Sequence, residues 1–232
     1  MSSPQIVPFQ FWRLSAFAGF AALCVLLGGC AAMPAKTRMA LGPSYEPGNV
    51  FVSSTTLPAS VRRVAVLPLA VIGTGRNLEA GRETLAPILQ AELARSSRFE
   101  LIPVTGNQLR SWTGRSVWTI TAQLPAEFLV RIREETGCDA VLFSQLNRYD
   151  PYPPLAVGLT LHLVEAELPR VVWAVDEMLD ASDPTVATGA QRFAARHPTE
   201  ASPLFDSRDV LRSPRRFGQY AAYTLVNTAP AR

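Results

Sequence analysis

The chain has 232 residues, of which 48% are hydrophobic and 18% are charged, and its formal net charge is +3. This composition allows one folded domain, or at most two, with a substantial core, and it excludes a disordered or disulfide-built protein. The longest basic runs are pairs, Arg62 with Arg63 and Arg215 with Arg216, so the chain lacks a basic stripe that follows phosphates, and no nucleic-acid partner is expected.

The amino-terminal segment has the parts of an export signal. Arg13 is the only side-chain positive charge before Cys30, and it directly precedes an apolar run over residues 14–29. A positive residue followed by a short apolar core and small residues is typical of such signals. The run is shorter than the roughly 20 residues that a spanning helix needs, so a permanent membrane span is the weaker alternative. Residues 1–29 are therefore predicted to be a signal peptide.

The end of that segment resembles the lipobox of bacterial lipoproteins, which here reads Leu27, Gly28, Gly29 and Cys30. In that family a dedicated peptidase cuts just before the cysteine. The resemblance implies that Cys30 becomes the lipid-modified first residue of the mature chain. Ala31 stands where an aspartate would imply inner-membrane retention, so the implied location is the outer membrane, with the domain facing the periplasm.

Cysteine usage agrees with export. Cys24 leaves with the predicted signal and Cys30 is used by the lipid, so Cys138 alone remains and cannot form an internal disulfide. The apolar residues after Cys138 predict a small buried side chain rather than a reactive thiol.

A tether is predicted between the anchor and the folded region. Residues 31–60 are rich in Pro, Ser, Thr, Gly and Ala and have no sustained strand or helix period. Such composition favours a flexible linker. The predicted organisation is thus a lipidated tether over residues 30–60 and one domain over residues 61–232.

The first half of that domain alternates predicted strands and helices. An apolar run at residues 64–69 predicts a strand that is covered on both faces. Leucines spaced seven, four and four apart predict an amphipathic helix over residues 78–96, kinked or begun by Pro87. A second strand over residues 99–104, a helix over residues 124–136 and a third strand over residues 138–146 follow.

The second half begins with a hairpin. Alternating apolar residues at 157–164 predict a fourth strand, and residues 170–179 predict a fifth that pairs with it antiparallel and extends the third. Asp183 and Ser213 each precede a proline, which is typical of a helix start. The sequence therefore predicts a single three-layer α/β domain, with a mixed sheet of three parallel strands plus an antiparallel hairpin and with flanking helices.

This pattern resembles a group of periplasmic domains. The group comprises curli-secretion-type lipoproteins, penicillin-binding-protein-activator lipoproteins and the amino-terminal domain of the Tol translocation protein. The resemblance lies in residues 62–69, 93–104, 135–149, 157–177 and 213–217. A curli-type pore is not expected, because barrel strands need about 9–11 alternating residues each and only a short loop separates the third and fourth strands.

The glycines after the first strand do not complete a nucleotide motif. Gly73 and Gly75 are present, but Leu78 stands where a dinucleotide fingerprint has its third glycine. The alternative function is a periplasmic enzyme or small-ligand binder that uses residues 73–77, at the end of the parallel strands. A deep polar pocket there would favour this alternative.

No catalytic or metal motif is recognised. His162 and His197 share no ligand spacing with each other or with Cys138, and Glu134 with Glu135 indicates a solvated helix face. We therefore expect no enzyme activity, no cofactor and no metal.

Four residues are the candidates for partner contact. Tyr149 and Tyr152 lie in a proline-stiffened loop, and Arg215 and Arg216 open the last helix, where basic groups oppose the helix dipole. Tyrosine and arginine are favoured anchors at protein interfaces. The expected function is an accessory or assembly factor that binds another envelope protein, with its oligomeric state left open.

Overall fold

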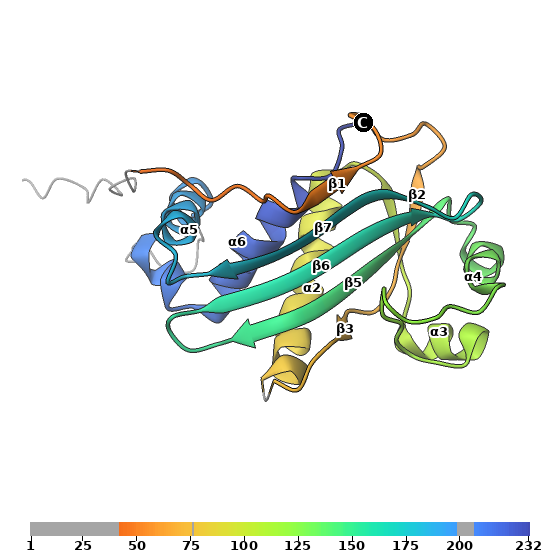
Figure 1. Cartoon of the computed structure of the whole chain (residues 1–232), viewed down its shortest axis with the longest axis horizontal. Coiled ribbons are helices and arrows are strands. Elements are labelled where there is room, and N and C mark those ends of the chain that lie inside the picture. Colours follow the sequence, from red (N-terminus) through yellow and green to blue (C-terminus); the bar gives the residue numbers. More distant parts are fainter. Residues whose placement is uncertain (1–41, 76, 199–206) are drawn as a thin grey trace, which may run out of the picture. The chain divides into compact units, whose positions relative to one another are not determined.

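The computed structural model describes residues 42–75, 77–198 and 207–232. The chain divides into two compact units, Met1–Arg38 and Met39–Arg232, and every described residue belongs to the second. The predicted signal peptide and Cys30 lie outside the described residues. The fold of the second unit is shown in Figure 1.

Within the described residues, the strands form one 7-stranded mixed sheet in the order β1-β7-β6-β5-β2-β4, with β3 also paired to β5 (Figure 1). The strands are β1 (Val50–Val52), β2 (Arg63–Val66), β3 (Ala70–Val71), β4 (Glu100–Pro103), β5 (Ala140–Asp150), β6 (Ala156–Glu165) and β7 (Arg170–Asp180). β2 pairs parallel with β4 and β5, whereas β6 pairs antiparallel with β5 and β7. The predicted parallel strands and antiparallel hairpin are confirmed.

Helices cover both faces of this sheet. The helices are α2 (Leu78–Ser96), α3 (Gly106–Thr113), α4 (Phe128–Thr136), α5 (Pro184–Arg196) and α6 (Pro214–Val226), with a 3-10 turn η1 (Ser207–Leu211). One core contains side chains of α2, α5 and α6, and a second core on the other face contains those of α3 and α4. The three-layer α/β prediction is therefore confirmed.

The central strand β5 explains why two cores form. Val141 faces the core of α3 and α4, and the next residue, Leu142, faces the core of α2, α5 and α6. Successive side chains of a strand point to opposite faces, so an uninterrupted apolar run is buried on both. In β6, by contrast, Leu161 is buried and His162 is half-buried on the opposite face, as the alternation predicts.

The helix starts follow the predicted caps. The Asp183 carboxylate accepts a hydrogen bond from the Thr185 amide at 2.7 Å, and the Ser213 hydroxyl accepts one from the Arg216 amide at 3.4 Å. Each cap is followed by proline, whose missing N–H costs nothing in the first turn. No helix among the described residues is long and apolar enough to cross a membrane.

The helix predicted over residues 124–136 begins later, at Phe128. Pro125 disfavours a helical conformation at the residue before it. The Phe128 amide then closes a turn on the Pro125 carbonyl at 3.0 Å, and the helix starts only after this turn.

Residues 42–60 belong to the domain, which corrects the predicted tether and the predicted domain start at residue 61. β1 pairs antiparallel with β7, and Thr56 forms a bridge with Ala231 near the end of the chain. The Glu177 carboxylate accepts hydrogen bonds from the Tyr45 hydroxyl and from the backbone amides of Gly48 and Asn49. We call residues 42–60 the amino-terminal strap; residues 30–41 lie outside the described part.

Candidate functional site

A leucine side chain packs against the loop that follows the parallel strands. Leu78 is buried, and a Cβ built at Gly73 or Gly75 would lie 3.6 or 3.2 Å from that side chain. The amides of Leu78 and Gly81 already donate to the carbonyls of Gly75 and Asn77. A phosphate at a helix start requires such amides to face it. The geometry of this loop is therefore that of a packed turn.

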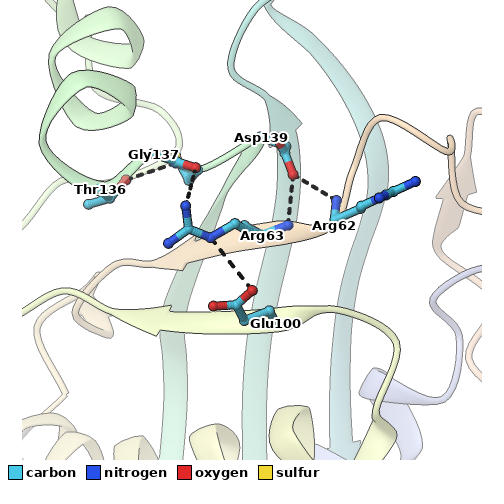
Figure 2. A network of polar contacts seen from close by, with 7 residues as sticks. Arg62, Arg63, Glu100, Thr136, Gly137 and Asp139 are labelled. Atoms are coloured by element: carbon cyan, nitrogen blue, oxygen red, sulfur yellow. Dashed lines mark hydrogen bonds and ion pairs between the residues drawn. The ribbon is translucent and has the colours of Figure 1, made fainter.

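The opposite end of the parallel strands carries a network of polar contacts (Figure 2). The Asp139 carboxylate accepts hydrogen bonds from the backbone amides of Arg62 and Arg63 at 2.9 and 2.8 Å. The Arg63 guanidinium donates to the Gly137 carbonyl at 3.0 Å and lies 3.6 Å from the Glu100 carboxylate. These contacts join β2, β4 and the turn between α4 and β5. The network therefore stabilises the packing of these elements against one another.

Of the two candidate tyrosines, one is buried and one is exposed. Tyr149 is 6% exposed, and its ring lies so close to Gly81 that a Cβ there would be 2.6 Å from it. A β-bulge between Leu146 and Arg148 shifts the register and turns Tyr149 toward the core. Tyr149 is therefore corrected from a surface candidate to a core residue. Tyr152, in the turn after β5, is 76% exposed.

The two candidate arginines also differ. Arg215 is exposed, whereas Arg216 is half-buried. The Arg216 guanidinium donates to the His197 carbonyl at 2.6 Å and to the Gln219 side chain at 2.9 Å, and it lies over the Phe193 ring at 5.9 Å. Burial lowers the pKa of Arg216. Arg216 thus joins α5 to α6, and its partners are inside the domain.

Exposed side chains gather on the sheet face that points away from α2, α5 and α6. In Figure 1 this face of β5, β6 and β7 is toward the viewer, with α2 and α6 behind it. We call the following four residues the outer strip: Phe51, Arg148, Asp176 and Met178. Phe51 and Met178 are 53% and 50% exposed.

Hydrogen bonds hold the polar part of the outer strip. The Asn147 amide donates to the Thr160 hydroxyl at 2.7 Å, and that hydroxyl donates to the Asp176 carboxylate at 2.8 Å. The Arg148 guanidinium lies against the Met178 sulfur and donates to the Asp150 carboxylate at 2.7 Å. Ordered polar groups therefore lie between the exposed side chains of Phe51 and Met178.

Sequence reasoning missed the outer strip, although one signal for it was present. Met178 is an apolar residue between Asp176 and Asp180 in the phase of β7 that faces away from α2, α5 and α6, whereas Glu177 and Leu179 point to the core face. Phe51 falls in the predicted tether because residues 31–60 are rich in Pro, Ser, Thr, Gly and Ala and show no sustained strand or helix period. Only the pairing of β1 with β7 brings Phe51 beside Ala174 on this face.

His162 lies on the sheet face that carries the outer strip, where it pairs in register with Phe143 of β5 and Ala174 of β7. Burial of the ring lowers the pKa of His162, and the Asp176 carboxylate offsets part of that effect. Because the folded pKa is depressed, the unfolded chain takes up the proton first as the pH falls. The stability that neutral His162 contributes is complete above about pH 6.5 and is lost as the pH falls toward the lowered folded value.

We expect His162→Gln to flatten the pH dependence of Tm between about pH 5 and pH 7, since the substitution removes the titrating group. Thermal unfolding of both proteins at matched ionic strength measures this. An NMR titration that places the His162 pKa above about 6.5 in the folded protein would contradict the expectation.

Other reactive groups are dispersed or enclosed. No three His, Cys, Asp or Glu side chains among the described residues gather as a metal site. Cys138 is buried, and its burial raises the pKa of the thiol. A buried thiol with a raised pKa is a poor nucleophile.

The comparisons with known proteins find similarity only among solved structures. No family model and no curated protein matches the sequence. The chain is similar to PelC of the Paraburkholderia phytofirmans dodecamer, at 12% identity and a TM-score of 0.43, with 79% of this chain and 98% of that chain covered.

Two further structures are lipoprotein GNA1162 of Neisseria meningitidis and the C-terminal domain of LpoB of Escherichia coli. For GNA1162 the identity is 17% and the TM-score 0.38, with 51% of this chain and 79% of that chain covered. For LpoB the values are 20% and 0.34, with coverage of 50% and 81%. A lipoprotein is among these solved structures, as it is among the proteins that the sequence resembles. All three TM-scores are below 0.5, so we infer nothing about the function of this chain from these structures.

Proposed function

We propose that this protein is an outer-membrane lipoprotein, anchored by lipid on Cys30, whose domain faces the periplasm and binds another envelope protein as an accessory or assembly factor. The sequence from Leu27 to Cys30 supports the anchor. The outer strip is the observation that supports binding to a protein. We infer no enzyme activity, because the polar groups at both ends of the parallel strands are engaged in structural contacts.

The spacing of the outer strip suits a protein better than a small molecule. Phe51 pairs with Ala174, and Met178 lies four positions further along β7. At about 3.3 Å per residue, the two exposed apolar side chains are separated by roughly 13 Å along the strand. A partner helix or strand that lies along β7 would cover both.

The polar groups of the strip favour specific rather than loose binding. Asp176 is held by the Thr160 hydroxyl, and Arg148 by the Asp150 carboxylate. Side chains that are already ordered lose less conformational freedom when a partner binds. The half-exposed Phe51 and Met178 would supply the apolar contact at the same time.

A photo-crosslinking amino acid at Met178 or Tyr152 is expected to trap an envelope protein in intact cells. The same amino acid at Glu134, which is exposed on α4, is the control and should give no specific adduct. Mass spectrometry of the adducts identifies the partner. If the Met178, Tyr152 and Glu134 positions give the same adducts, or if none contains an envelope protein, the binding proposal is wrong.

A further inference from the structure

The two edges of the sheet differ in how they are protected. β4 forms one edge, where the amides of Glu100 and Val104 donate toward β2 and Pro103 therefore faces the free side. Proline has no amide hydrogen to offer another strand. β1 forms the other edge (Figure 1), and residues 48–54 contain neither proline nor a charged residue. Proline and charge are common features that keep an edge strand from pairing with another chain, and β1 lacks both.

The free side of β1 presents two backbone donors and two acceptors. The Ser53 amide donates to the Val172 carbonyl at 2.9 Å, and the Asn49 carbonyl accepts from β7 at 3.1 Å. Since backbone groups of successive residues point to opposite sides of a strand, Val50 and Val52 direct theirs away from β7. No hydrogen bond with a described residue uses these groups. The edge is therefore open to another strand.

A second copy of this edge matches the open groups. When two β1 strands run antiparallel with Phe51 opposite Phe51, the backbone groups of Val50 in one copy meet those of Val52 in the other. Each copy brings the same donors and acceptors, so a two-fold axis between the strands satisfies all of them. β1 carries no charge, so identical copies do not repel each other at this seam.

This arrangement also covers the exposed apolar side chains of β1. Phe51 and Val52 are 53% and 42% exposed. Opposite residues without a mutual hydrogen bond have Cα atoms about 4.5 Å apart and side chains on the same face. The two Phe51 rings would therefore contact each other, and such aromatic pairs stabilise a sheet. On the other face, Val52 of each copy would contact Val50 of the other.

We propose that two copies of this protein pair through their β1 edges while both are anchored in one membrane, an inference that rests on the proposed anchor for the local concentration. A stable interface usually involves about 20–30 residues of each partner, far more than this short seam. Anchoring raises the effective concentration of the copies, so a weak contact forms there. The two outer strips would then continue each other across the axis, and the envelope partner would meet a two-fold symmetric surface.

Cysteine crosslinking in cells tests this pairing. The tested protein carries Phe51→Cys and Cys138→Ala and keeps Cys30. A Cα separation of about 4.5 Å lies within the range that a disulfide spans, about 4.4–6.8 Å. We expect copper phenanthroline, as the oxidant, to give a disulfide-linked dimer on a non-reducing gel. The matched control is Val130→Cys on α4, where Val130 is 52% exposed, and this variant should remain monomeric.

A second pair of variants tests whether the dimer depends on backbone pairing. Val52→Pro removes the outward amide and leaves the hydrogen bonds to β7 in place, whereas Val52→Thr keeps the amide. A dimer with Val52→Pro in both copies lacks two of its hydrogen bonds across the seam. From the usual contribution of a hydrogen bond, we expect dimer formation to fall about 30-fold relative to Val52→Thr. Thermal unfolding of both variants checks that the domain is folded.

Each of four outcomes would overturn the inference. Phe51→Cys could give no dimer, or no more dimer than Val130→Cys, which would indicate chance collision in the membrane. The dimer could form equally well with Val52→Pro, which would exclude strand pairing. A photo-crosslinking amino acid at position 51 could trap another envelope protein and never a second copy, which would assign the edge to that protein.

Palmitate labelling of the Phe51→Cys protein separates this inference from the anchor. A labelled protein that stays monomeric would refute the pairing and leave the anchor in place. An unlabelled monomer would overturn both.

Discussion

Gly81→Ala is expected to lower the free energy of unfolding by about 1–3 kcal/mol, as overpacking in a buried site does. A Cβ at this position of α2 would lie 2.6 Å from the Cγ and 2.8 Å from the Cβ of Tyr149. Those atoms are at the root of a side chain fixed on β5, so they cannot swing away as the end of a flexible side chain can. The helix or the strand must move instead.

The sign of this effect distinguishes packing from helix propensity. Alanine is favoured over glycine inside a helix by about 1 kcal/mol, so propensity alone predicts that Gly81→Ala stabilises the protein. Chemical denaturation measures the net effect. The control is Gly48→Ala, since Gly48 has open space around its Cα and an ordinary φ angle, and we expect a change within about 0.5 kcal/mol. A Gly81→Ala protein as stable as this control would show that α2 and β5 are not in close contact.

Local signals in the sequence account for most of the fold. The apolar run around Val141 predicted a strand buried on both faces, and helices cover both faces of β5. Pro184 and Pro214 predicted the starts of α5 and α6, because a cap followed by proline acts within one turn of helix. These features depend on neighbouring residues only, so a single sequence is enough to predict them.

The features that were missed depend on residues far apart in the chain. β1 has only three residues and is stabilised by pairing with β7, which its own composition does not indicate. Tyr149 reaches the core because a bulge between Leu146 and Arg148 changes the alternation by one position. A shift of one residue reverses the side of the sheet that a side chain faces, so the interpretation of Tyr149 as a surface residue was wrong.

The candidate site was only partly accessible from the sequence for the same reason. Tyr152 is exposed as its loop composition suggested, but Arg216 binds the His197 carbonyl on the preceding helix, a contact without a sequence motif. One overlooked signal was Glu177, a carboxylate in the core phase of β7 between Val175 and Leu179. A carboxylate in such a position needs hydrogen-bond donors, and the strap supplies them.

Cys30→Ala is expected to abolish acylation completely, because the lipid can be attached only to a cysteine that follows the cleavage site. Metabolic labelling with a palmitate analogue measures this. Cys138→Ala is the matched control and should keep full labelling, since the Cys138 thiol is buried in the domain. Cell fractionation should then show that the Cys30→Ala protein leaves the outer-membrane fraction. Unchanged labelling of the Cys30→Ala protein would contradict the anchor.

The same substitution separates the anchor from the surfaces of the domain. The outer strip lies in the part of the chain after Gly42, so loss of the lipid leaves its geometry intact. Crosslinking from Met178 in cells should fall in the Cys30→Ala background, because the domain is no longer concentrated near its partner at the membrane. Crosslinking that is equally strong without the lipid would mean that the partner meets this domain away from the membrane.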